Sequence, residues 1–163
     1  MKNIYPLIAL LCFGLFSTSQ AQVKELKRYQ REGSTILKGV AVPADKALFI
    51  SSGMVAPVKD ENAKGVARYG DTYTQSIGAL KNIEAALQEA GLTMNDVVSL
   101  KVFIAPDPSK NDQVDFEGWF KAYPKFFMNE QNPNKVARTT LGVHSLARPG
   151  LLVEVEVVAV YPD

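Results

Sequence analysis

Cysteine and histidine are nearly absent from this chain of 163 residues. The one cysteine is Cys12, inside an apolar segment at the N-terminus, and the one histidine is His144. Beyond that segment the sequence therefore offers no disulfide, no thiol nucleophile and no thiolate metal ligand. A single histidine also argues against a metal centre built from several histidines. The composition thus predicts no metal site.

An excess of positive charge is also missing. The sequence has 18 Lys and Arg against 17 Asp and Glu, and its apolar N-terminal segment holds one lysine and no acidic residue. The remainder is therefore electrically balanced, whereas proteins that bind nucleic acid neutralise phosphates with many basic side chains. We expect no nucleic-acid partner.

Long apolar runs are confined to the N-terminus. Lys2 precedes an apolar stretch over residues 4–16, and Ser19-Gln20-Ala21 matches a small-x-small cleavage site. We expect a secretory signal peptide over residues 1–21 that is cleaved before Gln22, leaving residues 22–163 as a single domain. The protein is then periplasmic or secreted by a bacterium, without membrane attachment. The alternative is an uncleaved anchor, for which the apolar stretch is short, because a bilayer span takes about 20 residues.

The rest of the chain alternates between strand-like and helix-like patterns. The patterns predict strands over residues 34–42, 47–51, 97–105, 136–143 and 151–161, and helices over residues 71–91 and 112–128. The order β-β-α-β-α-β-β predicts an α+β fold, an α/β sandwich with one mixed sheet and two helices on one face. The nearly continuous apolar character of residues 97–105 predicts a central strand.

Several local signals refine these elements. A turn at residues 43–46 favours a hairpin between the first two strands, while residues 22–32 fit a linker or an edge strand and residues 55–69 a loop. Asp71 and Thr72 are suited to cap the first helix and Gly91 to end it, and Pro124 should kink the second helix. Along the second helix runs an aromatic stripe, which is more typical of a core than of a ligand site: Phe116, Phe120, Tyr123 and Phe127.

Three charged residues lie inside the last two predicted strands. Arg138 interrupts the first, and Glu154 and Glu156 share one face of the second, because side chains on a strand repeat every two residues. One interpretation places all three on a solvated face or edge. The other is a guanidinium that binds a carboxylate and a glutamate that activates water, both facing one pocket. The pattern alone leaves both open.

Several motifs resemble the Rid family (reactive intermediate deaminases, also called the YjgF family and labelled endoribonuclease L-PSP). ARTTLGV at residues 137–143 and LVEVEVVAV at residues 152–160 resemble its C-terminal signature. GALKNIEAALQEAG followed by DVVSLKVF is similar to its central helix and strand, and FISSG resembles its early strand end. The resemblance implies a chorismate-mutase-like fold and a homotrimer with pockets in the clefts between subunits.

The resemblance also implies a chemistry, the hydrolysis of enamines and imines derived from amino acids to 2-keto acids and ammonia, as by a 2-iminobutanoate/2-iminopropanoate deaminase. No cofactor is implied. Arg138 would bind the substrate carboxylate, and Glu154, favoured over Glu156 because the preceding loop looks one residue longer, would position water. The remaining implied pocket residues are Thr140, Ser52, Gly53 and Phe120.

This sequence departs from the family pattern at two places. GSTILKGVAVP stands where the family has a segment with a pocket tyrosine, so that tyrosine has no evident counterpart, and Phe120 stands where the family has a pocket asparagine. A non-catalytic alternative therefore stays open, in which a periplasmic trimer binds or senses a small carboxylate. A ribonuclease is disfavoured by the balanced charge.

Overall fold

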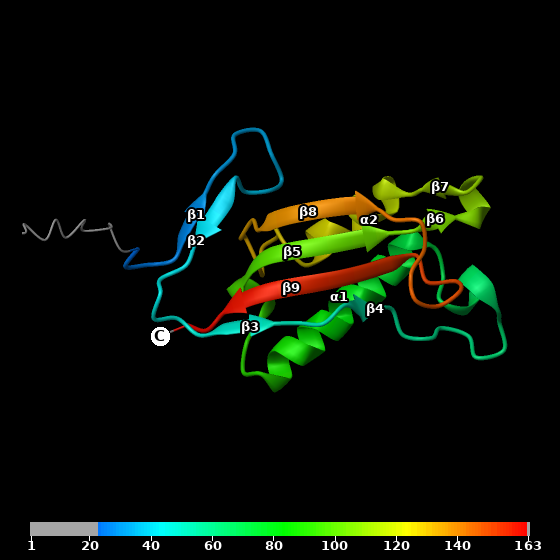
Figure 1. Cartoon of the computed structure of the whole chain (residues 1–163), viewed down its shortest axis with the longest axis horizontal. Helices are drawn as coiled ribbons and strands as arrows, with labels where there is room; N and C mark the ends of the chain where they lie inside the picture. Colours follow the sequence, from blue (N-terminus) through cyan, green and yellow to red (C-terminus); the bar gives the residue numbers. More distant parts are fainter. Residues whose placement is uncertain (1–22, 163) are drawn as a thin grey trace, which may run out of the picture.

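One five-stranded mixed sheet organises the chain (Figure 1). The computed structural model describes residues 23–162, so the predicted signal peptide over residues 1–21 lies outside the described residues. The strand order is β3-β9-β5-β8, with β4 also paired to β9. Its strands are β3 (Leu48–Ile50), β4 (Met54–Val55), β5 (Val97–Ile104), β8 (Ala137–Gly142) and β9 (Val153–Val160). β5 runs parallel to β8 and antiparallel to β9, and it lies in the interior of the sheet as predicted.

Both α-helices cover the same face of this sheet, which confirms the predicted α+β architecture (Figure 1). They are α1 (Thr72–Glu89) and α2 (Phe116–Ala122), and the buried core between them and the sheet includes alternate residues of β5 and β9. Leu100, Val102 and Ile104 of β5 are fully or almost fully buried there. The opposite face has no helix over it among residues 23–162, and we call it the open face.

The first helix forms as its sequence predicts. The Asp71 carboxylate accepts a hydrogen bond from the Thr74 amide at 2.8 Å and so caps the N-terminus. Gly91 follows the C-terminus with φ of +75°, a conformation that suits glycine. The stripe of Leu80, Ile83 and Leu87 is fully buried against the sheet.

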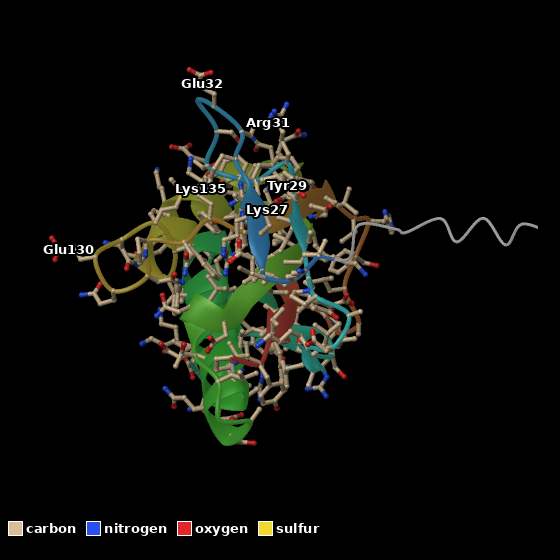
Figure 2. All side chains as sticks on the ribbon, turned by 90° about the vertical axis from the view of Figure 1, so that its left-hand side faces the viewer. Lys27, Tyr29, Arg31, Glu32, Glu130 and Lys135 are labelled. Carbon is tan, nitrogen blue, oxygen red and sulfur yellow. The ribbon has the colours of Figure 1, made fainter. Side chains whose placement is uncertain are left out.

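The predicted hairpin of residues 34–42 with 47–51 is wrong. β2 (Gly39–Ala41) pairs instead with β1 (Lys27–Tyr29), the segment that fitted a linker or edge strand, whereas β3 pairs with β9. Arg28 explains why the early segment is held in place, because its guanidinium donates to the carbonyls of Lys135 at 2.9 Å and Val97 at 3.1 Å. The β1–β2 hairpin stands at one end of the sheet, and Figure 2 shows its residues at that end of the molecule.

The second helix is shorter than predicted. Asn111 and Asp112 have φ of 55°, outside the helical region, so α2 begins only after Asp115, whose carboxylate accepts a hydrogen bond from the Gly118 amide. At the predicted kink, Pro124 lies in a 3-10 turn, η4 (Tyr123–Lys125), that ends α2.

Short elements complete the described chain. The predicted loop of residues 55–69 includes the end of β4 and one 3-10 turn, η1 (Gly65–Arg68). The remaining short elements are η2 (Met94–Asp96), η3 (Pro108–Lys110), β6 (Pro106–Asp107) and β7 (Gln113–Val114).

Candidate functional site

Strand parity places Arg138 and Thr140 on the helix-covered face of the sheet. In the parallel register Arg138 is opposite Leu100 and Thr140 is opposite Val102, two residues buried in the core. Paired residues of neighbouring strands point to the same face. The guanidinium of Arg138 is therefore directed toward α2 rather than toward the open face.

Aromatic rings of α2 and its continuation surround the Arg138 guanidinium. Its Cζ lies 4.3 Å from the ring centroid of Tyr123, 5.4 Å from that of Phe120 and 6.0 Å from that of Trp119. Arginine stacks favourably on such rings. We call these four residues together with Thr140 the aromatic–arginine site.

The guanidinium in this site lacks an anionic partner. Arg138 Nη1 is buried and has no hydrogen-bond partner within residues 23–162. Burial lowers the pKa of Arg138, but a guanidinium remains positive at neutral pH. A buried cation is costly when it is unpaired, so the site is electrostatically suited to an anion.

Three further polar atoms of this site are unsatisfied. Thr140 Oγ1, Trp119 Nε1 and Tyr123 Oη are buried and make no hydrogen bond with the described part of the chain. Nearly all buried polar atoms in proteins are hydrogen-bonded, and each exception calls for an explanation. Together with Arg138 Nη1 they form a group of unused donors, the type of group that binds a carboxylate.

The aromatic stripe of the second helix divides into two parts. Tyr123 and Phe127 are buried in the core, as is Trp119, but Phe116 and Phe120 are 38% and 51% exposed. Those two rings stack on each other with centroids 6.4 Å apart. The sequence prediction of a core stripe is therefore correct for its C-terminal half and wrong for its N-terminal half.

Glu154 and Glu156 lie on the open face. Glu154 is opposite Phe103 and Glu156 is opposite Lys101 in the antiparallel register, and Lys101 Nζ approaches Glu156 Oε2 at 3.5 Å. Glu154 forms no ion pair with any described side chain. Glu154, which the resemblance favours as the residue that positions water, is thus the glutamate of the two without an ion-pair partner.

A glycine makes room for the Glu154 carboxylate. A Cβ atom added at Gly53 would overlap Glu154 Oε1, so any larger residue at position 53 would displace the carboxylate. Ser52, beside it, is exposed. We call Ser52, Gly53 and Glu154 the glutamate site.

The structure therefore brings the predicted residues together in two groups and not in one. Arg138, Thr140 and Phe120 meet on the helix-covered face, while Gly53 and Glu154 meet on the open face. Sequence reasoning did not place Trp119 and Tyr123 in the site. Their spacing could have indicated a place in the site, because Trp119 is adjacent to Phe120 and Tyr123 follows Phe120 by about one helical turn.

The segment that stands in place of the family's tyrosine-containing segment includes β2, and Gly39 is the first residue of that strand. Tyr29 is its direct register partner on β1 and is 44% exposed. Lys27 Nζ lies 5.2 Å from the Tyr29 ring centroid, and Figure 2 shows both side chains on the outer surface of the hairpin.

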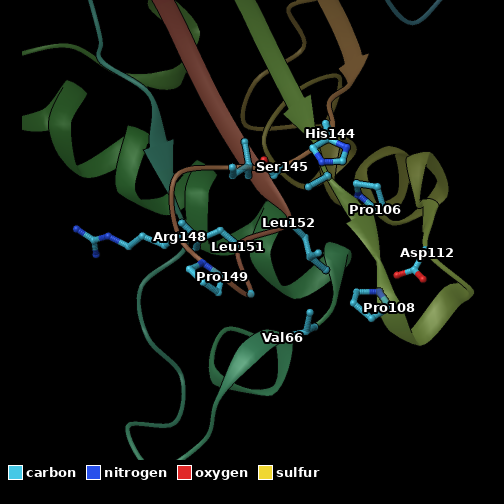
Figure 3. A pocket seen from close by; sticks show the side chains of 13 residues that line it. Val66, Pro106, Pro108, Asp112, His144, Ser145, Arg148, Pro149, Leu151 and Leu152 are labelled. Carbon is cyan, nitrogen blue, oxygen red and sulfur yellow. The ribbon is translucent and has the colours of Figure 1, made fainter.

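A separate cavity of about 460 Å³ lies near the loop that joins β8 to β9 (Figure 3). His144 lines it together with prolines and leucines, but the guanidinium of Arg148 points away from it. The charged group of Arg148 therefore does not face this cavity. Within residues 23–162 no helix is long and apolar enough to cross a bilayer, and no cluster of three or more His, Cys, Asp or Glu residues is arranged to hold a metal ion.

Known proteins resemble this chain in both sequence and fold. The family model described as endoribonuclease L-PSP matches residues 39–161. A RutC family protein of Haemophilus influenzae is 31% identical over 113 residues, which cover 69% of this chain and 78% of that protein. The Rid family protein YyfB of Yersinia pestis, described as of unknown function, superposes with a TM-score of 0.62 at 22% identity, covering 83% of this chain and 98% of that one. TdcF of E. coli, solved with bound serine, superposes with a TM-score of 0.56 at 24% identity, covering 86% of this chain and 100% of that one.

Proposed function

This chain belongs to the Rid family, also called the YjgF or endoribonuclease L-PSP family, and has its chorismate-mutase-like fold; from this premise we propose that it hydrolyses reactive imines and enamines derived from amino acids. The observation that carries the proposal is the half-buried Arg138 guanidinium, whose buried Nη1 atom has no hydrogen-bond partner among residues 23–162. A substrate carboxylate would accept hydrogen bonds from it and would neutralise its charge.

Glu154 supplies the base in this proposal. An imine carbon is already electrophilic, so a positioned water and one carboxylate suffice to hydrolyse it. The water oxygen bonds to carbon and one proton reaches the nitrogen, which gives a carbinolamine. Glu154 then transfers the hydroxyl proton to the nitrogen, the C–N bond breaks, and a 2-keto acid and ammonia leave. The absence of an ion pair with any described side chain leaves Glu154 free for this proton transfer.

The site is assembled from two copies of the chain. Arg138 and Glu154 point to opposite faces of one sheet, so a single copy cannot direct both toward one substrate. We place the substrate in clefts of a homotrimer, where one copy supplies the aromatic–arginine site and its neighbour the glutamate site. Exposed apolar side chains on the open face support such an assembly, since Leu48, Ile50 and Leu141 are 47%, 71% and 48% exposed.

A binding protein is the second candidate. The structure of TdcF with bound serine is that of a family member holding an amino acid, whose carboxylate could equally be held by Arg138 here without any reaction. Binding alone requires the arginine and not the glutamate. The unpaired Glu154 beside Gly53 therefore favours the hydrolase.

An imine-trapping assay tests the hydrolase. An amino-acid oxidase generates 2-imino acids, and semicarbazide traps those that are not hydrolysed. We expect the purified protein to suppress the trapped product and Arg138→Ala to reduce this activity by about 10²–10³-fold, because the carboxylate loses its charged partner. Arg148→Ala is the matched control, since that side chain is exposed and points away from the cavity it borders. No activity in wild type across a broad amino-acid panel would refute the hydrolase, whereas equal activity of wild type and Arg138→Ala would refute the role of Arg138.

We also propose that the reaction takes place outside the cytoplasm, after removal of residues 1–21. Intact-mass measurement of the exported protein tests this location, and the expected N-terminus is Gln22. Recovery of the uncleaved chain would contradict it.

A further inference from the structure

Two exposed aromatic rings lie beside the unpaired guanidinium of Arg138. Phe116 and Phe120 are 38% and 51% exposed, although they stack on each other and stand one helical turn apart on α2. Large apolar side chains in such a helix are normally buried, as Trp119 of the same helix is. The core therefore does not account for these two rings.

The position of Phe120 relative to Arg138 defines what the ring can contact. Its centroid lies 5.4 Å from Arg138 Cζ. In a 2-imino acid the carboxylate and the side chain are attached to the same carbon, so a carboxylate held by Arg138 brings the side chain close to this ring. Aromatic rings pack favourably with centroids about 4.5–7 Å apart, a distance that a substrate ring one carbon further along can reach. The ring of Phe116 extends the apolar surface beyond Phe120.

Apart from Arg138, charged residues near these rings in the sequence are already paired. Lys121 Nζ lies 2.8 Å from Glu117 Oε1, and Lys110 Nζ lies 2.8 Å from Asp115 Oδ2. An acidic or basic substrate side chain would thus meet two phenyl rings and no unpaired counter-charge from these four residues. A side chain as small as methyl would leave most of the ring surface uncovered.

We propose that Phe116 and Phe120 make the site select 2-imino acids with an aromatic or large apolar side chain. This inference rests on the proposed function, because Arg138 must hold the carboxylate for the side chain to reach the rings. It adds a substrate class to that function and assigns Phe120 as the residue that determines specificity.

The test compares imines from four amino acids. Phenylalanine and leucine supply large apolar side chains, alanine a small one and aspartate a charged one. We expect wild-type kcat/KM for the phenylalanine imine to exceed that for the alanine imine by about 10-fold or more. Phe120→Asn should reduce this ratio by about 10-fold, because kcat/KM falls more for the phenylalanine imine than for the alanine imine. Met128→Asn is the matched control, because it places the same amide at a 37% exposed apolar position outside α2 whose positive φ asparagine tolerates.

Ligand binding provides a readout that does not depend on catalysis. Phenylpyruvate should raise the Tm of the wild-type protein more than pyruvate does, and Phe120→Asn should abolish the difference. If phenylpyruvate binds selectively but no imine is hydrolysed, the proposed hydrolysis fails while the selectivity stands. If the wild type hydrolyses all four imines equally, or if Phe120→Asn lowers activity on alanine and phenylalanine imines to the same extent, the selectivity is refuted and the hydrolase stands.

Discussion

The two faces of the central sheet accommodate charge in opposite ways. On the helix-covered face, Arg138 is enclosed by rings of Trp119, Phe120 and Tyr123 and its Nη1 atom has no partner among the described residues. On the open face, Glu156 is paired with Lys101 and Glu154 lies against a glycine. The first arrangement costs free energy of folding, whereas the second costs little because solvent reaches the carboxylates.

This difference indicates which of the charged residues binds a ligand. Stacking on the rings stabilises the Arg138 cation, but its buried Nη1 atom still carries a desolvation penalty that an apolar residue of similar size would not have. Arg138 is thus best explained by a ligand that reaches it. Glu154 is not an enclosed charge, so its position alone does not indicate a ligand. In the proposed homotrimer its role depends on which residues of a neighbouring copy contact the open face.

The largest effect on activity is expected when subunits that carry different substitutions are mixed in one trimer. In the proposed homotrimer, Arg138→Ala and Glu154→Gln each remove one half of every site, so each variant alone should be inactive. In trimers formed by co-expression of both variants, about a quarter of the clefts combine an intact arginine from one copy with an intact glutamate from its neighbour. Imine hydrolysis should therefore return to about a quarter of the wild-type rate.

The control for subunit mixing is the double variant Arg138→Ala/Glu154→Gln co-expressed with wild type. In those trimers each cleft is intact only when both contributing copies are wild type, so the same fraction of about a quarter is expected. Inactivity of the mixed single variants, with this control active, would place both residues of a site in one copy and overturn the arrangement across subunits.

A smaller effect is expected from Gly53→Ala. The added Cβ overlaps Glu154 Oε1, so the carboxylate must move, and a displacement of about 1 Å of a catalytic group costs about 10²-fold in kcat. Substrate binding at Arg138 on the other face should be retained, so KM should change little. Gly39→Ala is the matched control, because a Cβ at Gly39 meets no atom within 4 Å. A loss of activity in Gly39→Ala as large as that in Gly53→Ala would show that the effect is not specific to Glu154.

The sequence predicted the elements whose signals are local. The caps at Asp71 and Gly91 and the apolar stripe of α1 are contained within one segment, so α1 was predicted almost to the residue. The uninterrupted apolar run of β5 likewise identified an interior strand. The hairpin was mispredicted because strand pairing depends on partners far along the chain, here β1 for β2 and β9 for β3.

The candidate site shows the same limit. Arg138 and Glu154 were singled out by charge within apolar strands, and the motifs of the family assigned them roles. Their separation onto two faces depends on the register of β8 and β9 against β5, which no local pattern specifies. The exposure of Phe116 and Phe120 was missed because a helical aromatic stripe has the same spacing in a core and beside a ligand.

Thr140→Val is expected to have the smallest effect, and that effect is stabilisation of the folded protein. Thr140 Oγ1 is buried without a hydrogen-bond partner in the described chain, so replacing the hydroxyl by a methyl group of similar size removes a desolvation penalty. We expect the free energy of unfolding to rise by about 1 kcal/mol, as measured by urea denaturation, while affinity for a 2-keto acid falls. Thr139→Val is the matched control, because Thr139 points to the open face and is exposed, and its stability should change by less than about 0.5 kcal/mol. If Thr140→Val instead destabilises the protein by about 1 kcal/mol or more, the Thr140 hydroxyl must be hydrogen-bonded in the free protein. The helix-covered face would then have one unused hydrogen-bond donor fewer, which would weaken the contrast between the two faces.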